Sequence, residues 1–314
     1  MTAASHSVQF PATFVMPLFC DSPRSIEYAR AAVQSLVDQT DPDWRLIVID
    51  DCSPVPPSQL AADLENLKAI DARRIVIVRQ PTNNRQGVCR NVGIEMAQRA
   101  GSPMVLFLDA DDLAHPRRLE VTRRIFDTTT ADFVYSPFDV IDEESRPFER
   151  GDLTPSIAEI LDELEAGPVE GYDCWIPIAI RTGYLTLTST VSVRTAVAVA
   201  HPFPRSPGSE DFHTFLRMSA GGAVFSYQSE IPAQYRVNRT TGSADRSRWG
   251  REEYYATKLA ADIDAFEQAG KLALARGVVT ASETDDLREQ FHARLAETIR
   301  GEGFGHLLDP QPSF

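Results

Sequence analysis

The sequence has few cysteines and no long apolar run. Its four cysteines form no Cys-x-x-Cys pair and lie at no metal-ligand spacing from a histidine, which argues against a zinc site. Sparse, unpaired cysteines are typical of a reducing cytosol, so we expect a cytoplasmic protein. Residues 1–9 lack the basic start and apolar core of a secretory signal. No stretch approaches the roughly 18 apolar residues of a membrane-spanning helix, so we expect no integral membrane segment.

Positive charge is also in short supply. Acidic side chains outnumber basic ones by 45 to 31, which gives a net charge of −14. A surface of this sign repels phosphate backbones and anionic lipid headgroups, so we expect no nucleic acid partner. The length of 314 residues suits one large α/β domain with an appendage.

The first 135 residues alternate between short apolar runs and amphipathic segments. Four near-continuous apolar runs predict strands buried on both faces of a parallel sheet, at residues 13–18, 46–49, 75–78 and 104–108. Helical spacing of apolar residues follows these runs, at residues 26–37, 58–70, 87–100 and 116–128. The alternation predicts an open, doubly wound α/β sheet, in which ligands bind beyond the carboxyl ends of the strands.

The pattern loosens beyond residue 135. It predicts a strand over 132–136, a short helix over 156–166, a strand over 186–193, a helix over 210–220, and short strands over 223–227 and 234–237. A polar, flexible segment is expected over 240–247, and two helices over 252–276 and 282–300.

Aspartates stand where two of the predicted strands end. Asp50 and Asp51 follow one apolar run, and Asp109, Asp111 and Asp112 follow another. Either cluster alone is most simply a set of turn or helix-cap residues. Carboxylates this close raise one another's pKa unless a cation neutralises them. Their hard oxygen ligands suit Mn²⁺ or Mg²⁺, shared with substrate phosphates.

Seven segments, in order, resemble the signatures of glycosyltransferase family 2. They are PLFCD (17–21), SLVDQT (35–40), LIVIDDCSP (46–54), NNRQGVCRNVGI (83–94), VLFLDADDLAHPRRLE (105–120), SEDFHTFLRM (209–218) and QYRVNRTTGS (234–243). Their co-occurrence in order is far more specific than any one motif. The resemblance implies the GT-A fold, a Rossmann-like and mostly parallel sheet flanked by helices, here with a C-terminal helical extension.

The resemblance also implies an activity and a division of the chain. The activity is inverting, divalent-metal-dependent transfer of a hexosyl or N-acetylhexosaminyl group from a nucleotide-sugar, expected to be a UDP-sugar, to an acceptor hydroxyl. The GT-A domain would span residues 1–240, with a nucleotide-sugar-binding half at 1–135 and an acceptor-binding half at 136–240. A helical extension over 241–300 and a flexible tail over 301–314 would follow.

Site residues carry over from the same motifs. Asp211 matches the catalytic base, Asp51 the carboxylate that bonds the uracil, and Asp111 the metal ligand. Asp109 matches a nucleotide-sugar-binding position near the ribose and sugar and, with Asp112, would also support the metal site. The other implied nucleotide-sugar-binding residues are Pro17, Leu18, Phe19, Asp21, Arg90, Asn91 and Ala110.

General chemistry agrees with this assignment. Transfer to a hydroxyl needs a base on the acceptor side and neutralisation of the departing diphosphate on the other. Asp211 opens a predicted helix, where the partial positive charge favours its ionised form. A plain helix N-cap is the alternative interpretation of this residue.

The sequence departs from the family pattern at three positions. Cys20 replaces an asparagine and Cys52 a glycine, while Asn238 replaces a histidine that can lie near the metal. Because an amide is a poorer metal ligand than an imidazole, we expect a lower metal affinity.

The sequence gives the least information about the residues that bind the acceptor. Tyr172, Trp175 and Glu210 are weak candidates for acceptor binding, and core packing is the alternative for both aromatic residues. The C-terminal helices are expected either to cover the acceptor cleft or to form a homodimer contact.

Two other functions stay open at this point. A sugar-phosphate nucleotidyltransferase shares the general sheet but has a glycine-rich, basic loop after its first strand, and PLFCDSPRS contains no glycine. A non-catalytic nucleotide-sugar-binding protein would not need the Glu210–Asp211 pair, which this chain retains.

Overall fold

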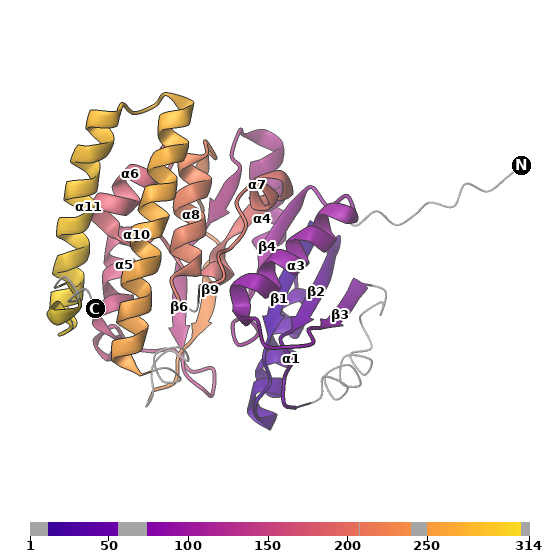
Figure 1. Ribbon diagram of the computed structural model, residues 1–314. Helices are drawn as coiled ribbons and strands as arrows, with labels where there is room; N and C mark the ends of the chain where they lie inside the picture. The colour runs from indigo at the N-terminus through magenta and orange to yellow at the C-terminus, as the bar shows by residue number, and fades with distance from the viewer. Residues whose placement is uncertain (1–11, 56–73, 207, 240–249, 309–314) are drawn as a thin grey trace, which may run out of the picture.

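The chain folds around a seven-stranded, mostly parallel sheet flanked by helices (Figure 1), which confirms the predicted α/β fold. The computed structural model describes residues 12–55, 74–206, 208–239 and 250–308. The strands of this sheet are β1 (Ala12–Leu18), β2 (Trp44–Asp50), β3 (Ile75–Arg79), β4 (Met104–Phe107), β5 (Phe133–Tyr135), β7 (Ser192–Arg194) and β8 (Phe225–Tyr227). They lie in the order β3–β2–β1–β4–β7–β5–β8, and β7 runs antiparallel to both of its neighbours.

Helices cover both faces of this sheet, which is why its first strands are apolar throughout. The helices of the first half are α1 (Pro23–Val37), α3 (Arg85–Arg99) and α4 (Arg118–Thr128). Side chains alternate along β1, so Phe14 and Met16 join the cluster with α1 and α4, while Val15 joins the cluster with α3.

A glycine sets how close α3 comes to the sheet. A Cβ at Gly93 would lie 2.3 Å from Cγ1 of Val15, so only glycine allows this approach. The close packing brings the N-terminus of α3 against the end of β2.

The second half adds a small sheet and a layer of long helices. Strands β6 (Phe138–Ile141) and β9 (Ala233–Arg236) pair in parallel. Helix α8 (Glu210–Ala220) packs along α10 (Arg251–Arg276), which forms an antiparallel hairpin with α11 (Ala281–Gly301) at the end of the molecule farthest from β3 (Figure 1). The remaining elements are η2 (Arg150–Asp152), α5 (Pro155–Ala166), α6 (Trp175–Pro177), η3 (Ile178–Thr182), η4 (Thr188–Thr190), α7 (Thr195–Ala200) and η5 (Gly305–Leu308).

The segment predicted as one strand over 186–193 differs in the structure. It forms the 3-10 turn η4, and only its end pairs as β7. The hydroxyl of Thr186 donates to the Ser136 carbonyl at 3.1 Å, and that of Ser189 donates to the Asp112 carboxylate at 2.5 Å. The Thr190 hydroxyl also donates to the Leu187 carbonyl at 2.8 Å, and local side-chain bonds of this kind compete with strand pairing.

Residues 304–308, expected within a flexible tail, pack on the core instead. The ring of Phe304 stacks on Tyr255 with centroids 4.8 Å apart, and η5 follows. The helix predicted over 58–70, the polar segment over 240–247 and the last six residues lie outside the described part of the chain. No helix within the described part is long and apolar enough to cross a membrane.

Candidate active site

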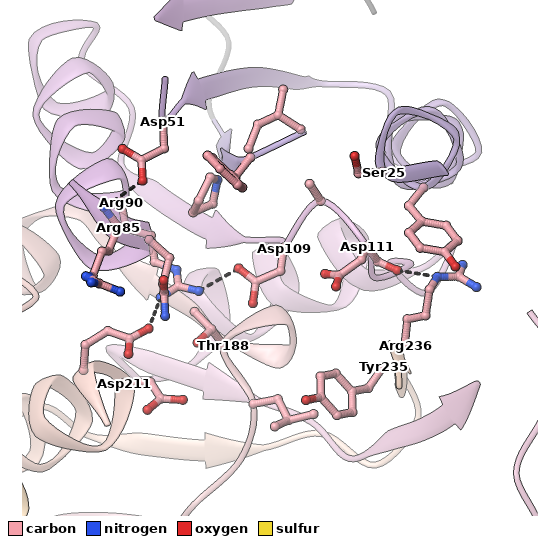
Figure 2. Close-up of a pocket in the computed structure, with 18 of the residues that line it drawn as sticks. Ser25, Asp51, Arg85, Arg90, Asp109, Asp111, Thr188, Asp211, Tyr235 and Arg236 are labelled. Atoms are coloured by element: carbon pink, nitrogen blue, oxygen red, sulfur yellow. Dashed lines mark hydrogen bonds and ion pairs between the residues drawn. The ribbon is translucent and has the colours of Figure 1, made fainter. Parts of the chain in front are cut away.

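A pocket of about 610 Å³ opens beyond the carboxyl ends of β1, β2 and β4 and reaches the start of α8 (Figure 2). This is where a doubly wound sheet binds its ligands. The sequence-predicted residues that line it are Pro17, Leu18, Phe19, Asp21, Asp51, Arg90, Asp109, Ala110, Asp111, Glu210 and Asp211.

Asp51 stands between β2 and α3. Its two carboxylate oxygens accept the backbone N–H groups of Asn84 and Arg85, at 2.6 and 2.7 Å. These donors belong to the N-terminus of α3, where a negative charge is favourable. The preceding Asp50 is fully buried and pairs with Arg79 at 2.6 Å. Only the second carboxylate of the pair therefore reaches the pocket.

Arg90 joins the two halves of the site. Its buried guanidinium donates to Asp109 at 2.6 Å and to Glu210 at 2.7 Å. Burial alone lowers the pKa of Arg90, but the two carboxylates outweigh it and raise that pKa above its ordinary value. The charged bridge fixes the end of β4 relative to the start of α8.

The aspartates after β4 point in different directions. Asp111 lies on the pocket wall, whereas Asp112 is buried and lies outside the residues that line the pocket. The Asp112 carboxylate accepts the Ser189 hydroxyl at 2.5 Å and the Arg236 backbone N–H at 2.9 Å. Burial and the two neighbouring aspartates raise its pKa. Asp112 therefore shapes the turn and does not face the pocket.

Hard oxygen atoms gather where a divalent cation was predicted. Asp109, Asp111 and Asn238 all line the pocket and offer carboxylate and amide oxygens. Mg²⁺ and Mn²⁺ bind through one or two protein carboxylates together with phosphate oxygens and water. Asp111 and Asn238 could offer oxygen ligands to such an ion, whereas Asp109 already pairs with Arg90.

Asp211 is the second residue of α8 and lies across the pocket from Asp51 (Figure 2). Its Oδ1 atom accepts the Tyr184 hydroxyl at 2.5 Å and the Phe212 backbone N–H at 2.8 Å. Burial, with the adjacent Glu210 charge, raises the pKa of Asp211 to about 7, although both hydrogen bonds oppose the rise. A carboxylate of this pKa can accept a proton at neutral pH.

Besides Asp112, three sequence-predicted residues lie outside the pocket. The Asn91 amide is occupied by the Phe203 backbone, with both hydrogen bonds at 2.8 Å, and it does not line the pocket. Trp175 is completely buried against Phe266 of α10, which is the core packing given above as its alternative role. Tyr172 is 64% exposed, but it is not among the residues that line the pocket.

Several pocket residues were not predicted. Ser25 and Tyr28 come from α1, Tyr184 from the loop before η4, and Tyr254 from α10. No local motif marks these positions. Arg236 could have been predicted, because it lies in the family-like QYRV segment. Its Nε donates to the Asp111 carbonyl at 2.8 Å (Figure 2).

Comparisons with known proteins identify the family that this chain resembles. The family model for glycosyl transferase family 2 matches residues 13–187. The succinoglycan biosynthesis protein ExoW of Rhizobium meliloti is 35% identical over 164 residues, 49% of each chain. TuaG of Bacillus subtilis, named for teichuronic acid biosynthesis, is 28% identical over 229 residues, which cover 73% of this chain and 81% of TuaG. The chain thus spans about half the length of ExoW.

Solved structures share the fold. Staphylococcus aureus TarS 1–349 in complex with UDP-GlcNAc superposes with a TM-score of 0.65 at 19% identity, covering 93% of this chain and 74% of TarS 1–349. The mannosyltransferase PcManGT of Pyrobaculum calidifontis, in complex with GDP-Man and Mn²⁺, has a TM-score of 0.55 at 13% identity, covering 95% and 84% of the two chains. With the family model matching more than half of its residues, the chain belongs to glycosyltransferase family 2.

Proposed function

We propose that this protein transfers a hexosyl or N-acetylhexosaminyl group from a UDP-sugar to an acceptor hydroxyl, with inversion at the anomeric carbon and with a divalent metal. One observation carries the proposal: Asp211 lines the same pocket as Asp109 and Asp111 (Figure 2). Asp109 and Asp111 follow strand β4, whereas Asp211 lies on the opposite side of the pocket, at the start of α8. Such a pocket offers a base on one side and an anionic cation site on the other.

The uridine preference follows from Asp51. Each carboxylate oxygen has more than one lone pair, so a uracil N–H can bond to Asp51 beside the α3 donors that already hold it. Pro17, Leu18 and Phe19 line the pocket at the end of β1 and would contact the base. UDP and UDP-GlcNAc complexes of TarS are consistent with this preference.

The chain's own residues account for the remaining chemistry. When bound at Asp111 and Asn238, the metal would supply charge neutralisation to the diphosphate. Asp211 would take the proton as the acceptor oxygen bonds to the anomeric carbon, opposite the breaking bond to the diphosphate. Arg90 would keep Asp109 and Glu210 in place on either side of that step.

The names of two relatives suggest the chemistry of the acceptor. ExoW and TuaG are named for succinoglycan and teichuronic acid biosynthesis, so we extend to this chain a saccharide hydroxyl as acceptor. A cytoplasmic location rests on the four free cysteines. A homodimer through α10 and α11 stays a prediction.

A donor screen tests the proposal without knowledge of the acceptor. Thermal shifts are measured with UDP-, GDP- and dTDP-sugars, each with and without Mn²⁺. We expect the largest stabilisation from a UDP-sugar with Mn²⁺, because binding to the folded state alone raises the melting temperature. Release of UDP from that donor would exclude a purely binding protein, and equal shifts from all nucleotides would contradict the role of Asp51.

Removal of the metal carboxylate should uncouple donor binding from the metal. We expect Asp111→Ala to abolish the Mn²⁺-dependent part of UDP binding, measured by titration calorimetry with and without Mn²⁺. The exposed Asp127 at the end of α4 provides the matched control, and Asp127→Ala should bind UDP as the parent does. An Asp111→Ala protein with unchanged Mn²⁺ dependence would remove this residue from the metal site.

A further inference from the structure

Tyr184 makes the closest side-chain contact to the proposed base. Its hydroxyl donates to Oδ1 of Asp211 at 2.5 Å. The Tyr184 ring stacks near Phe212, with centroids 6.2 Å apart and planes 22° from parallel. Tyr184 comes from the loop between η3 and η4, so it reaches the start of α8 from a separate part of the chain.

The hydrogen bonds to Asp211 distinguish its two oxygens. Tyr184 and the Phe212 N–H both donate to Oδ1. Among the described residues, none donates a hydrogen bond to Oδ2. The contacts therefore fix the rotation of the carboxylate and leave Oδ2 as the oxygen that can receive a proton from an acceptor.

The Tyr184 hydrogen bond opposes the groups that favour a protonated Asp211. Burial and the Glu210 charge on α8 raise the pKa of Asp211, whereas the Tyr184 hydroxyl and Arg90 of α3 lower it. From α10, Tyr254 lines the same pocket, and the Lys258 ammonium lies 5.6 Å from the Tyr184 ring centroid.

Neighbouring carboxylates hold Lys258 in place and keep Tyr184 protonated. Lys258 is paired with the fully buried Asp262 at 2.6 Å, and Asp262 also accepts the Ser209 hydroxyl at 2.5 Å. Burial and the Asp211 charge raise the pKa of Tyr184, so it keeps its proton and remains a donor across the working pH range.

We infer that Tyr184 is a positioning residue for the base: its hydroxyl orients the Asp211 carboxylate and stabilises the ionised form that accepts the acceptor proton. This inference rests on the proposed role of Asp211. It gives the loop between η3 and η4 a catalytic purpose that no sequence motif indicates.

The Tyr184→Phe variant tests the inference through the pH profile. Loss of a hydrogen bond to a charged acceptor should raise the apparent pKa of the rate by about 1–2 units. With a parental midpoint near pH 7, the rate at pH 7 should fall roughly 5–50-fold and recover above pH 9. The assay follows UDP release from UDP-N-acetylglucosamine with Mn²⁺, where water replaces the acceptor. Tyr172→Phe, outside the pocket, should keep the parental profile.

A measurement without substrate gives the same information. The melting temperature of Asp211→Asn minus that of the parent, followed from pH 4 to 10, reports the pKa of Asp211 in the folded protein. In the parental background this difference should rise up to about pH 7 and then level off. In a Tyr184→Phe background it should continue to rise by a further 1–2 pH units.

The outcomes separate the inference from the proposed function. If Asp211→Asn leaves UDP release unchanged, the base assignment fails, while the melting data still report on the Tyr184 contact. If Asp211→Asn is inactive but Tyr184→Phe keeps the parental midpoint or loses rate equally at every pH, the inference is overturned.

If Tyr184→Phe does not fold, 3-fluorotyrosine at position 184 replaces it. This stronger donor should lower the midpoint, and an unchanged or higher midpoint would overturn the inference.

Discussion

Asp211→Asn is expected to lower the rate of UDP release by roughly 10²–10⁴-fold, the usual contribution of a positioned general base. Asparagine keeps the shape of the side chain, and its amide oxygen can accept the same two hydrogen bonds, so the backbone of α8 should not move. UDP binding should survive, because Asp211 is assigned to the acceptor proton and Asp51 and Asp111 to the nucleotide.

The same variant should be more stable than the parent at pH 8. The folded protein holds the Asp211 proton up to about pH 7, whereas the unfolded chain releases it near pH 4. Parental stability is therefore lost as the pH rises from 4 to 7, and asparagine avoids this loss. We expect a gain of about 3–5 kcal/mol at pH 8 that vanishes near pH 4.

The pH dependence of the parental rate also tests the role of Asp211. The rate should increase tenfold per pH unit below pH 7 and level off above it, as Asp211 becomes ionised. A rate within threefold of the parent for Asp211→Asn would show that this residue only serves the first turn of α8. A lower melting temperature together with lost UDP binding would indicate a structural role.

Arg90→Met is expected to cause the largest loss of stability. The guanidinium is 2% exposed and neutralises Asp109 and Glu210, and Glu210 is itself only 5% exposed. Removing one member of a buried ion pair leaves an uncompensated charge and costs about 3–5 kcal/mol. Chemical denaturation at pH 8 measures this loss directly.

A second substitution on α3 identifies the cause of this loss. Arg99→Met is the matched control on the same helix, since its pair with Glu95 is largely exposed and worth little. A loss for Arg90→Met below about 1 kcal/mol at pH 8 would contradict the bridging role.

The sequence predicted the sheet and its strand-end carboxylates well, for a physical reason. Strands buried on both faces must be apolar throughout, so β1, β2 and β4 stand out from the flanking polar segments. A polar residue that follows such a strand must lie at the sheet edge. Asp51, Asp109 and Asp111 obey this rule, and all three line the pocket.

The sequence did not predict which way the side chains point within a turn. Asp111 and Asp112 are adjacent and chemically identical, yet Asp112 faces inward because Ser189 and Arg236, distant in sequence, supply its hydrogen bonds. The same limit applies to aromatic residues in the irregular segment. Trp175 is buried by a C-terminal helix, whereas Tyr184 reaches the base, and composition alone does not distinguish them.

The most direct test of the central claim is the configuration of the sugar that this protein releases. The protein is incubated with Mn²⁺ and the α-linked UDP-sugar that stabilises it most, and proton NMR identifies the first anomer formed. Attack by water activated at Asp211, opposite the departing diphosphate, predicts that the β-anomer appears first in the parent and that release nearly stops in Asp211→Asn. First appearance of the α-anomer would contradict inverting transfer by an Asp211 base.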